Sequence, residues 1–193
     1  MIYVYGNSHA NFFTNILPAT EGISENSKFK CLCKRPMSAE NFLTIHYPNL
    51  INFISTSNKE TDFVLITVGE HDCRMELPQK INESPTEWKN ILHRYIDDFF
   101  PVILKLKAEG YRPIVWSGHP SSNLILSMEW NNYICELARK NNMEYFVSIM
   151  LECIVAGHNT INPHYYMKND TCHLNSETFL SIVEDKFKSY KLL

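Results

Sequence analysis

The sequence lacks the features that mark several classes of protein. It has no excess of basic residues, because 18 Lys and Arg stand against 21 Asp and Glu, a formal net charge of −3. Nothing in this balance would neutralise a phosphate backbone or an anionic membrane surface, so we expect neither as a partner. With 45% hydrophobic and 20% charged residues, the chain is also not of the collagen-like or low-complexity disordered type.

Long apolar runs are missing as well. No segment approaches the roughly 18 uncharged apolar residues of a membrane-spanning helix, and the first residues lack the basic stretch and apolar core of a secretory signal. The cysteines are scattered apart from one C-x-C, and we expect them to be reduced thiols: Cys31, Cys33, Cys73, Cys135, Cys153 and Cys172. These absences predict a cytoplasmic protein that does not bind membranes.

The length of 193 residues favours a single domain over residues 1–193, since no linker rich in Pro, Gly or Ser interrupts the chain. Short β-rich apolar runs predict strands at 2–5, 29–33, 62–68, 113–117 and 145–149. Helical periodicity between and after them predicts helices at 10–17, 88–106, 124–140 and 177–190. Regular alternation of strands and helices predicts a parallel five-stranded sheet with helices on both sides.

Proline and glycine residues refine the boundaries of these elements. We expect a polar, proline-marked loop at 78–85, a kink at Pro101 and a helix C-terminus at Gly110. The segment from about residue 156 to residue 173 is rich in Asn, His and Tyr and lacks periodicity. A long loop of this kind inside a compact domain is more often functional than idle.

Polar residues gather where strands end, which is where ligands bind in an open parallel sheet. Three segments stand out: Gly6-Asn7-Ser8-His9 after the first strand, Gly69-Glu70-His71-Asp72-Cys73-Arg74 after the third, and Asp170-Thr171-Cys172-His173 before the last helix. We expect their polar groups to converge on one edge of the sheet.

Ser8, His173 and Asp170 are the residue types of nucleophilic acyl transfer. An imidazole makes a hydroxyl nucleophilic by removing its proton, and a carboxylate orients the imidazole and stabilises its cation. The start of a helix favours the negative charge that develops during attack, which suits a nucleophile at Ser8. The simpler interpretation is that Ser8 or Asn7 only caps the helix.

Taken together, the three segments resemble the blocks of the SGNH (GDSL-type) hydrolases, in the same order and over almost the whole chain. The resemblance implies a flavodoxin-like three-layer α/β/α fold and hydrolysis of esters without a cofactor. It implies Ser8 as nucleophile, His173 as general base and Asp170 as the residue that orients it. Gly69 and His71 would help to bind the oxyanion, together with the Ser8 N–H. The G-x-S-x-G elbow of the α/β-hydrolases is absent.

Some positions depart from the family pattern. Asn7 replaces an Asp, which removes a charge next to Ser8 but keeps a hydrogen-bonding side chain. His71 replaces the Asn whose side chain donates to the oxyanion, and an imidazole can donate through one N–H. The glycine of the second block has no clear match, and segment 35–38 is the best local candidate. Segment 69–74 resembles a G-E-x-D-C-R variant of the third block.

Arg74 admits two interpretations. Its forked guanidinium could donate to a substrate carboxylate or to the oxyanion, or it could form a structural ion pair with Glu70 or Asp72. His9 and His119 also lie near strand ends, and we expect them to be hydrogen-bonded wall residues.

A metal site is not predicted. The nitrogen and sulfur ligands nearest the expected site lack the spacing of known zinc motifs: His71, Cys73, Cys172 and His173.

The sequence therefore predicts a serine esterase or deacylase acting on a small or glycan-linked acyl ester. Two alternatives stay open: an O-acyltransferase that uses the same residues on a sugar hydroxyl, and a catalytically silent binding module on the same scaffold.

Overall fold

The computed structural model describes residues 1–18, 20–35, 37–155, 161–170 and 172–193. Its sheet has six strands in the order β2-β3-β1-β4-β5-β6. β2 pairs antiparallel with β3, and the other neighbours are parallel. The strands are β1 (Ile2–Gly6), β2 (Gly22–Glu25), β3 (Phe29–Cys33), β4 (Phe63–Thr67), β5 (Pro113–Trp116) and β6 (Tyr145–Val147). The five parallel strands have the flavodoxin-like order, which confirms the predicted fold class.

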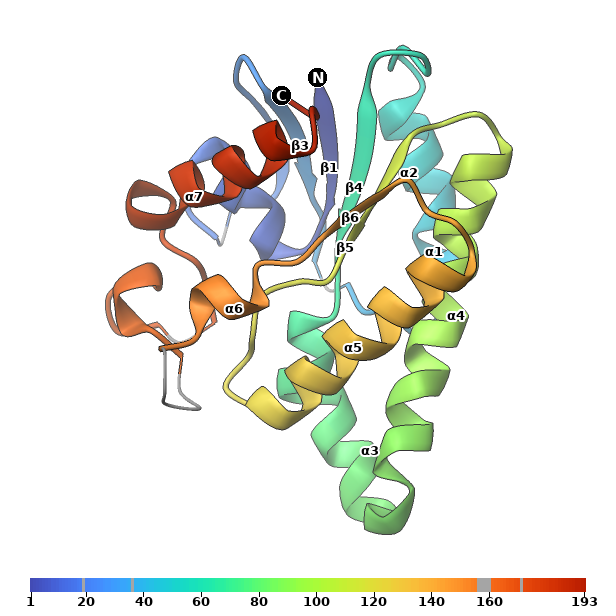
Figure 1. The fold of residues 1–193 in the computed structure, drawn as a ribbon, viewed down its shortest axis with the longest axis vertical. Coiled ribbons are helices and arrows are strands. Elements are labelled where there is room, and N and C mark those ends of the chain that lie inside the picture. The colour runs from blue at the N-terminus through green and yellow to red at the C-terminus, as the bar shows by residue number, and fades with distance from the viewer. Residues whose placement is uncertain (19, 36, 156–160, 171) are drawn as a thin grey trace.

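Helices cover both faces of the sheet (Figure 1). One face packs against α1 (Phe42–Ile45), α2 (Tyr47–Ile54), α4 (Trp88–Ala108) and α5 (Leu124–Lys140). The other packs against the 3-10 helix η1 (Ser8–Thr14) and α7 (Ser176–Ser189). The remaining helical elements are η2 (Asp72–Glu76), α3 (Leu77–Glu83), η3 (Pro85–Glu87), α6 (Met150–Cys153) and η4 (Pro163–Tyr165).

β1 shows how the two cores arise from the pleat of a strand. Tyr3 and Tyr5 belong to the core under α2, α4 and α5, whereas Ile2 and Val4 belong to the core under η1 and α7. Successive side chains of a strand point to opposite faces, so a strand covered on both sides is apolar throughout. All five residues of β1 and all five of β4 are buried.

The five predicted strands are confirmed, and the prediction of only five is wrong. β2 was missed because three of its four residues are exposed and it offers no apolar run. The predicted helix at 10–17 is the shorter 3-10 helix η1, which ends at Asn15 in the left-handed conformation with φ of 56°. α1, α2 and α6 were not predicted.

Prolines misled the prediction in two places. The loop expected at 78–85 is mostly helix α3, because Pro78 stands in the first turn, where its missing N–H costs nothing. Pro101 lies inside α4, which runs without a break from Trp88 to Ala108. Gly110 follows α4 with φ of 85°, as expected for a residue that ends a helix.

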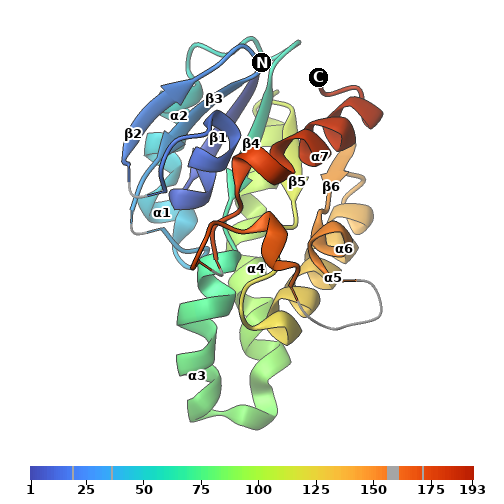
Figure 2. The ribbon, with the colours of Figure 1, turned by 90° about the vertical axis from the view of Figure 1, so that its left-hand side faces the viewer.

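α3 and the first half of α4 project beyond the sheet at the end where the parallel strands finish (Figures 1 and 2). Among the helices of the described residues, none combines the length and the apolar character needed to cross a membrane.

Gly69 turns the chain just after β4. Its φ is 103°, a conformation that residues with a Cβ rarely adopt. A Cβ built there would lie 2.6 Å from the indole ring of Trp130. Both the backbone conformation and the close ring therefore require glycine at this position.

We expect Gly69→Ala to lower the free energy of unfolding by about 3 kcal/mol, because it combines backbone strain with overpacking. Gly22→Ala is the matched control, since Gly22 has φ of 115° but nothing within 4 Å of the added Cβ. It should cost only about 1 kcal/mol. Urea unfolding of both variants measures the difference, and equal losses would show that contact with Trp130 is irrelevant.

Candidate active site

Ser8 and His173 meet at the end of β1. The Ser8 hydroxyl donates to His173 Nε2 at 2.8 Å, and His173 Nδ1 lies 2.7 Å from Asp170 Oδ2. Asn7 is the N-cap of η1, where its side chain accepts from the N–H of His9. The capping role therefore falls to Asn7, which leaves the Ser8 hydroxyl free to face the imidazole.

The loop that carries Asp170 and His173 is tied down by backbone contacts. Tyr166 and Leu174 form an antiparallel bridge, and the Met167 N–H donates to the His173 carbonyl at 3.0 Å. The buried hydroxyl of Tyr166 donates to the Pro120 carbonyl at 2.9 Å. Segment 161–175 is thereby held between β5 and α7, although Thr171 lies outside the described residues.

Asp170 is an ionised acceptor. Partial burial would raise its pKa, but hydrogen bonds from the backbone N–H groups of Cys172 and His173, at 2.8 and 3.0 Å, hold this pKa well below its ordinary value. Because a carboxylate has no proton to donate, Nδ1 of His173 carries the hydrogen. Nε2 then has the free lone pair that can take the Ser8 proton.

Burial and the neighbouring His9 lower the pKa of His173, and Asp170 opposes this shift. The imidazole is consequently neutral near pH 7, as a proton acceptor must be.

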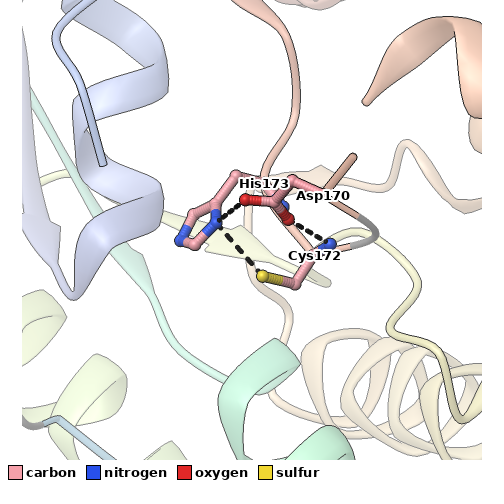
Figure 3. A group of neighbouring side chains, drawn as sticks. All are labelled: Asp170, Cys172 and His173. Carbon is pink, nitrogen blue, oxygen red and sulfur yellow. Dashed lines mark hydrogen bonds and ion pairs between the residues drawn. The ribbon is translucent and has the colours of Figure 1, made fainter. Parts of the chain in front are cut away.

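The Cys172 sulfur also contacts the imidazole, at 3.1 Å from His173 Nδ1 (Figure 3). Burial, together with the Asp170 carboxylate, raises the pKa of this thiol to about 12, so it stays protonated. Within the described part of the chain, Asp170, Cys172 and His173 form the only group of three or more His, Cys, Asp or Glu residues whose ligand atoms all lie within 4.8 Å of one another. These atoms bind one another and Ser8, and His71 and Cys73 do not join them.

A second carboxylate–imidazole pair lies next to the first. Glu70 Oε2 is 2.6 Å from His9 Nε2, and Glu70 Oε1 accepts from Arg74 Nε at 2.8 Å. Burial would raise the Glu70 pKa, but His9 above all, with His119 and Arg74, lowers it to about 2. Arg74 therefore forms with Glu70 the structural ion pair that was one of its two interpretations. His9 is hydrogen-bonded as expected, but the sequence did not predict that its partner is Glu70.

The remaining residues of the third block hold the loop in place. Asp72 is fully buried and accepts from the Ser38 hydroxyl at 2.5 Å, the Ala39 N–H at 3.0 Å and the Gly69 N–H at 3.0 Å. The Gly69 N–H is thus engaged with Asp72, which corrects the expectation that it binds an oxyanion. The His71 side chain is 29% exposed, with Nε2 3.6 Å from Glu76 Oε1.

Two cavities meet at Ser8 and His173. One, of about 250 Å³, has a buried apolar wall of Phe12, Phe13, Trp116 and Leu174 and an exposed rim that includes Ile16 and Leu17. The other, of about 550 Å³, is lined mainly by polar and charged side chains, including Asn7, Glu21, Arg35, His71 and Arg74. Pro36 of the candidate second block lies outside the described residues, and its neighbours Arg35 and Met37 line the polar cavity.

Comparisons with known proteins rest on structure alone, since no family model and no curated protein matches the sequence. A Bacteroides fragilis protein with the provisional name of acylhydrolase superposes with a TM-score of 0.68 and 14% identity, over 98% of this chain and 86% of its own. A GDSL-like lipase from Bacteroides thetaiotaomicron superposes with a TM-score of 0.66 and 14% identity, over 98% of this chain and 87% of its own. The psychrotrophic esterase EstA from Pseudoalteromonas sp. superposes with a TM-score of 0.51 and 16% identity, over 98% of this chain and 96% of its own.

The chain has the same fold as these three proteins. The fold that the resemblance implied is thereby confirmed over almost the whole chain.

The lowered pKa of Glu70 predicts an acid-dependent loss of stability. Its stabilising contribution is fully present above the unfolded value of 4.5 and disappears as the pH falls through about 2. Between these two pH values the wild type should lose on the order of 2–3 kcal/mol of unfolding free energy through Glu70. Glu70→Gln should not show this loss. Urea unfolding at a series of pH values measures this, with the exposed Glu83→Gln as control. Parallel curves for wild type and Glu70→Gln would contradict it.

Proposed function

We propose that this protein is a serine ester hydrolase in which Ser8 forms an acyl-enzyme. The observation that carries the proposal is the contact of 2.8 Å between the Ser8 hydroxyl and Nε2 of an imidazole whose other nitrogen faces an ionised carboxylate. Residues 165 positions apart meet in the geometry that activates a hydroxyl. The names of the structural neighbours, a GDSL-like lipase and an esterase inhibited by monoethylphosphonate, support the same chemistry.

The reaction has two halves. Ser8 Oγ attacks the ester carbonyl while its proton passes to His173 Nε2, and the imidazolium then gives this proton to the leaving alcohol. Water attacks the acyl-Ser8 ester with His173 as general base, and the released acid leaves Ser8 with its proton restored. Asp170 stabilises the imidazolium in both halves.

The oxyanion would be bound by the Ser8 N–H and by the His71 side chain. Ser8 is the first residue of η1, so its N–H is not used by the hydrogen bonds of that helix. His71 lines the polar cavity together with Ser8 and can donate one N–H. The Gly69 N–H is left out because it is bonded to Asp72.

The two cavities suggest how a substrate lies. An aliphatic acyl chain would occupy the cavity walled by Phe12, Phe13 and Trp116, because burying methylene groups there is favourable by about 0.8 kcal/mol each. The alcohol part would occupy the wider polar cavity, where Arg35 and Arg74 can donate to oxygen atoms of a sugar or of an anionic group. The preferred substrate is then an acyl ester with an aliphatic acid and a polar alcohol.

Ser8→Ala should abolish labelling by a fluorophosphonate and lower kcat for nitrophenyl esters by about 10⁴-fold or more. Asp170→Asn should lower kcat on the order of 10³- to 10⁴-fold. His71→Ala should lower kcat about 10²-fold, as expected for the loss of one oxyanion donor. Mass spectrometry of the labelled protein locates the adduct. Ester turnover that survives in Ser8→Ala, or folded wild type that takes no label, would favour a silent binding module instead.

Leu17→Asp tests the acyl cavity. Leu17 is 69% exposed at its rim, so the substitution should fold normally while placing a charge where the chain enters. We expect kcat/KM to fall about tenfold for octanoyl esters, a loss equivalent to one or two methylene groups, and to change little for acetyl esters. Ile125→Asp is the control, because Ile125 is 70% exposed on α5 and lines neither cavity. Equal effects on both esters would contradict the assignment.

A further inference from the structure

The pair formed by Glu70 and His9 is buried beside the nucleophile but takes no step in the proposed reaction. Glu70 is 3% exposed and His9 is 7% exposed, and their contact of 2.6 Å is typical of a hydrogen bond between charged groups. A buried carboxylate is stabilised only where cations or donors surround it. Arg74 supplies one of these through Nε, and His9 supplies the other.

The imidazole of His9 lies against that of His173. The two ring centres are 4.9 Å apart with an angle of 30° between the planes. The ring centres of His9 and His119 are 4.6 Å apart with an angle of 70° between the planes, and Nε2 of His119 donates to the Cys172 carbonyl at 2.8 Å. Burial, then His9, lowers the pKa of His119 to about 3, so this third ring is neutral. The ionised Glu70 carboxylate accepts from His9 Nε2, and His9 lowers the pKa of both His119 and His173.

We propose that Glu70 and His9 are positioning residues: the Glu70 carboxylate holds the His9 imidazole against the ring of His173, and His9 thereby keeps His173 a neutral proton acceptor. This inference rests on the proposed function, since it assigns His173 the role of base. It also explains why the third block carries Glu70 and Arg74: Arg74 holds the Glu70 carboxylate, and the carboxylate holds the His9 imidazole.

The titratable and charged groups that face His173 come from four parts of the fold. They are Asp170 and Cys172 from its own loop, His9 beyond β1, Glu70 and Arg74 beyond β4, and His119 beyond β5. Asp170 and Glu70 favour protonation of His173, whereas burial and His9 oppose it. His9 lowers the pKa of His173 by more than Glu70 raises it. Removing both residues should therefore make His173 easier to protonate.

The experiment follows the ring of His173 by NMR across a pH series in wild type, His9→Phe and the double variant Glu70→Gln/His9→Phe. Phenylalanine keeps a planar ring against His173 but has no ring nitrogens, and the double variant removes the buried carboxylate that would otherwise lose a partner. The acid limb of kcat/KM is measured alongside, since it reports the free enzyme's base.

Glu129→Gln is the matched control. Glu129 lies 2.9 Å from His93 Nε2, a pair of the same chemistry that connects α4 and α5 and lines neither cavity. Breaking that pair should change neither the midpoint of His173 protonation nor the acid limb of kcat/KM relative to wild type.

We expect His9→Phe to raise the midpoint of His173 protonation by roughly one pH unit, and the acid limb to move by the same amount. The double variant should shift in the same direction by less. Folded variants in which neither the midpoint nor the acid limb moves would overturn the proposal. The ring titration needs no substrate, so a shifted midpoint in a protein that hydrolyses no ester through Ser8 would refute the proposed function and leave the action of His9 on His173 standing.

Discussion

The contact between Ser8 and His173 is the constraint on which the rest of the site depends. It joins residues 165 positions apart, and no local interaction could hold them together. The parallel sheet does this by ending β1 and β4 at one edge, at the point between these two strands where the strand order reverses. Brought there by β1, Ser8 meets a loop that is fixed between β5 and α7 by the Tyr166–Leu174 bridge and by the Tyr166 hydroxyl. The geometry of the site is therefore a property of the whole topology.

Much of this topology could be predicted from the sequence, because buried parallel strands are apolar throughout and their lengths are set by the residues that end them. Phe63 to Thr67 has that character, and β4 lies there. β2 could not be found in this way, since an exposed edge strand carries no apolar pattern. Pro78 and Pro101 were misinterpreted because the effect of a proline depends on its position in a helix, which tertiary packing decides.

Within the site, the sequence indicated residue types but not which hydrogen bonds they would form. Gly69 and Asp72 illustrate the limit: the resemblance implied that the Gly69 N–H binds the oxyanion, whereas this N–H donates to the Asp72 carboxylate. Glu70 and His9 are 61 positions apart, and only the pairing of β1 with β4 makes them neighbours. A clue was nevertheless present, because a glutamate and a histidine each follow a buried strand and adjacent parallel strands end together.

The electrostatics of the site follow from burying two carboxylates close to three imidazoles. Each carboxylate needs a cation or several donors, and the two solutions differ. Asp170 is satisfied by two backbone N–H groups and the neutral ring of His173, which leaves that ring free to accept a proton. Among the described residues, Glu70 accepts hydrogen bonds from the side chains of Arg74 and His9 and from no backbone N–H. A carboxylate that is stabilised by backbone N–H groups leaves its imidazole partner neutral and able to accept a proton. The second carboxylate is stabilised by Arg74 instead, and it fixes the His9 ring with its centre 4.9 Å from that of His173. Two chemically similar pairs thus serve different purposes side by side.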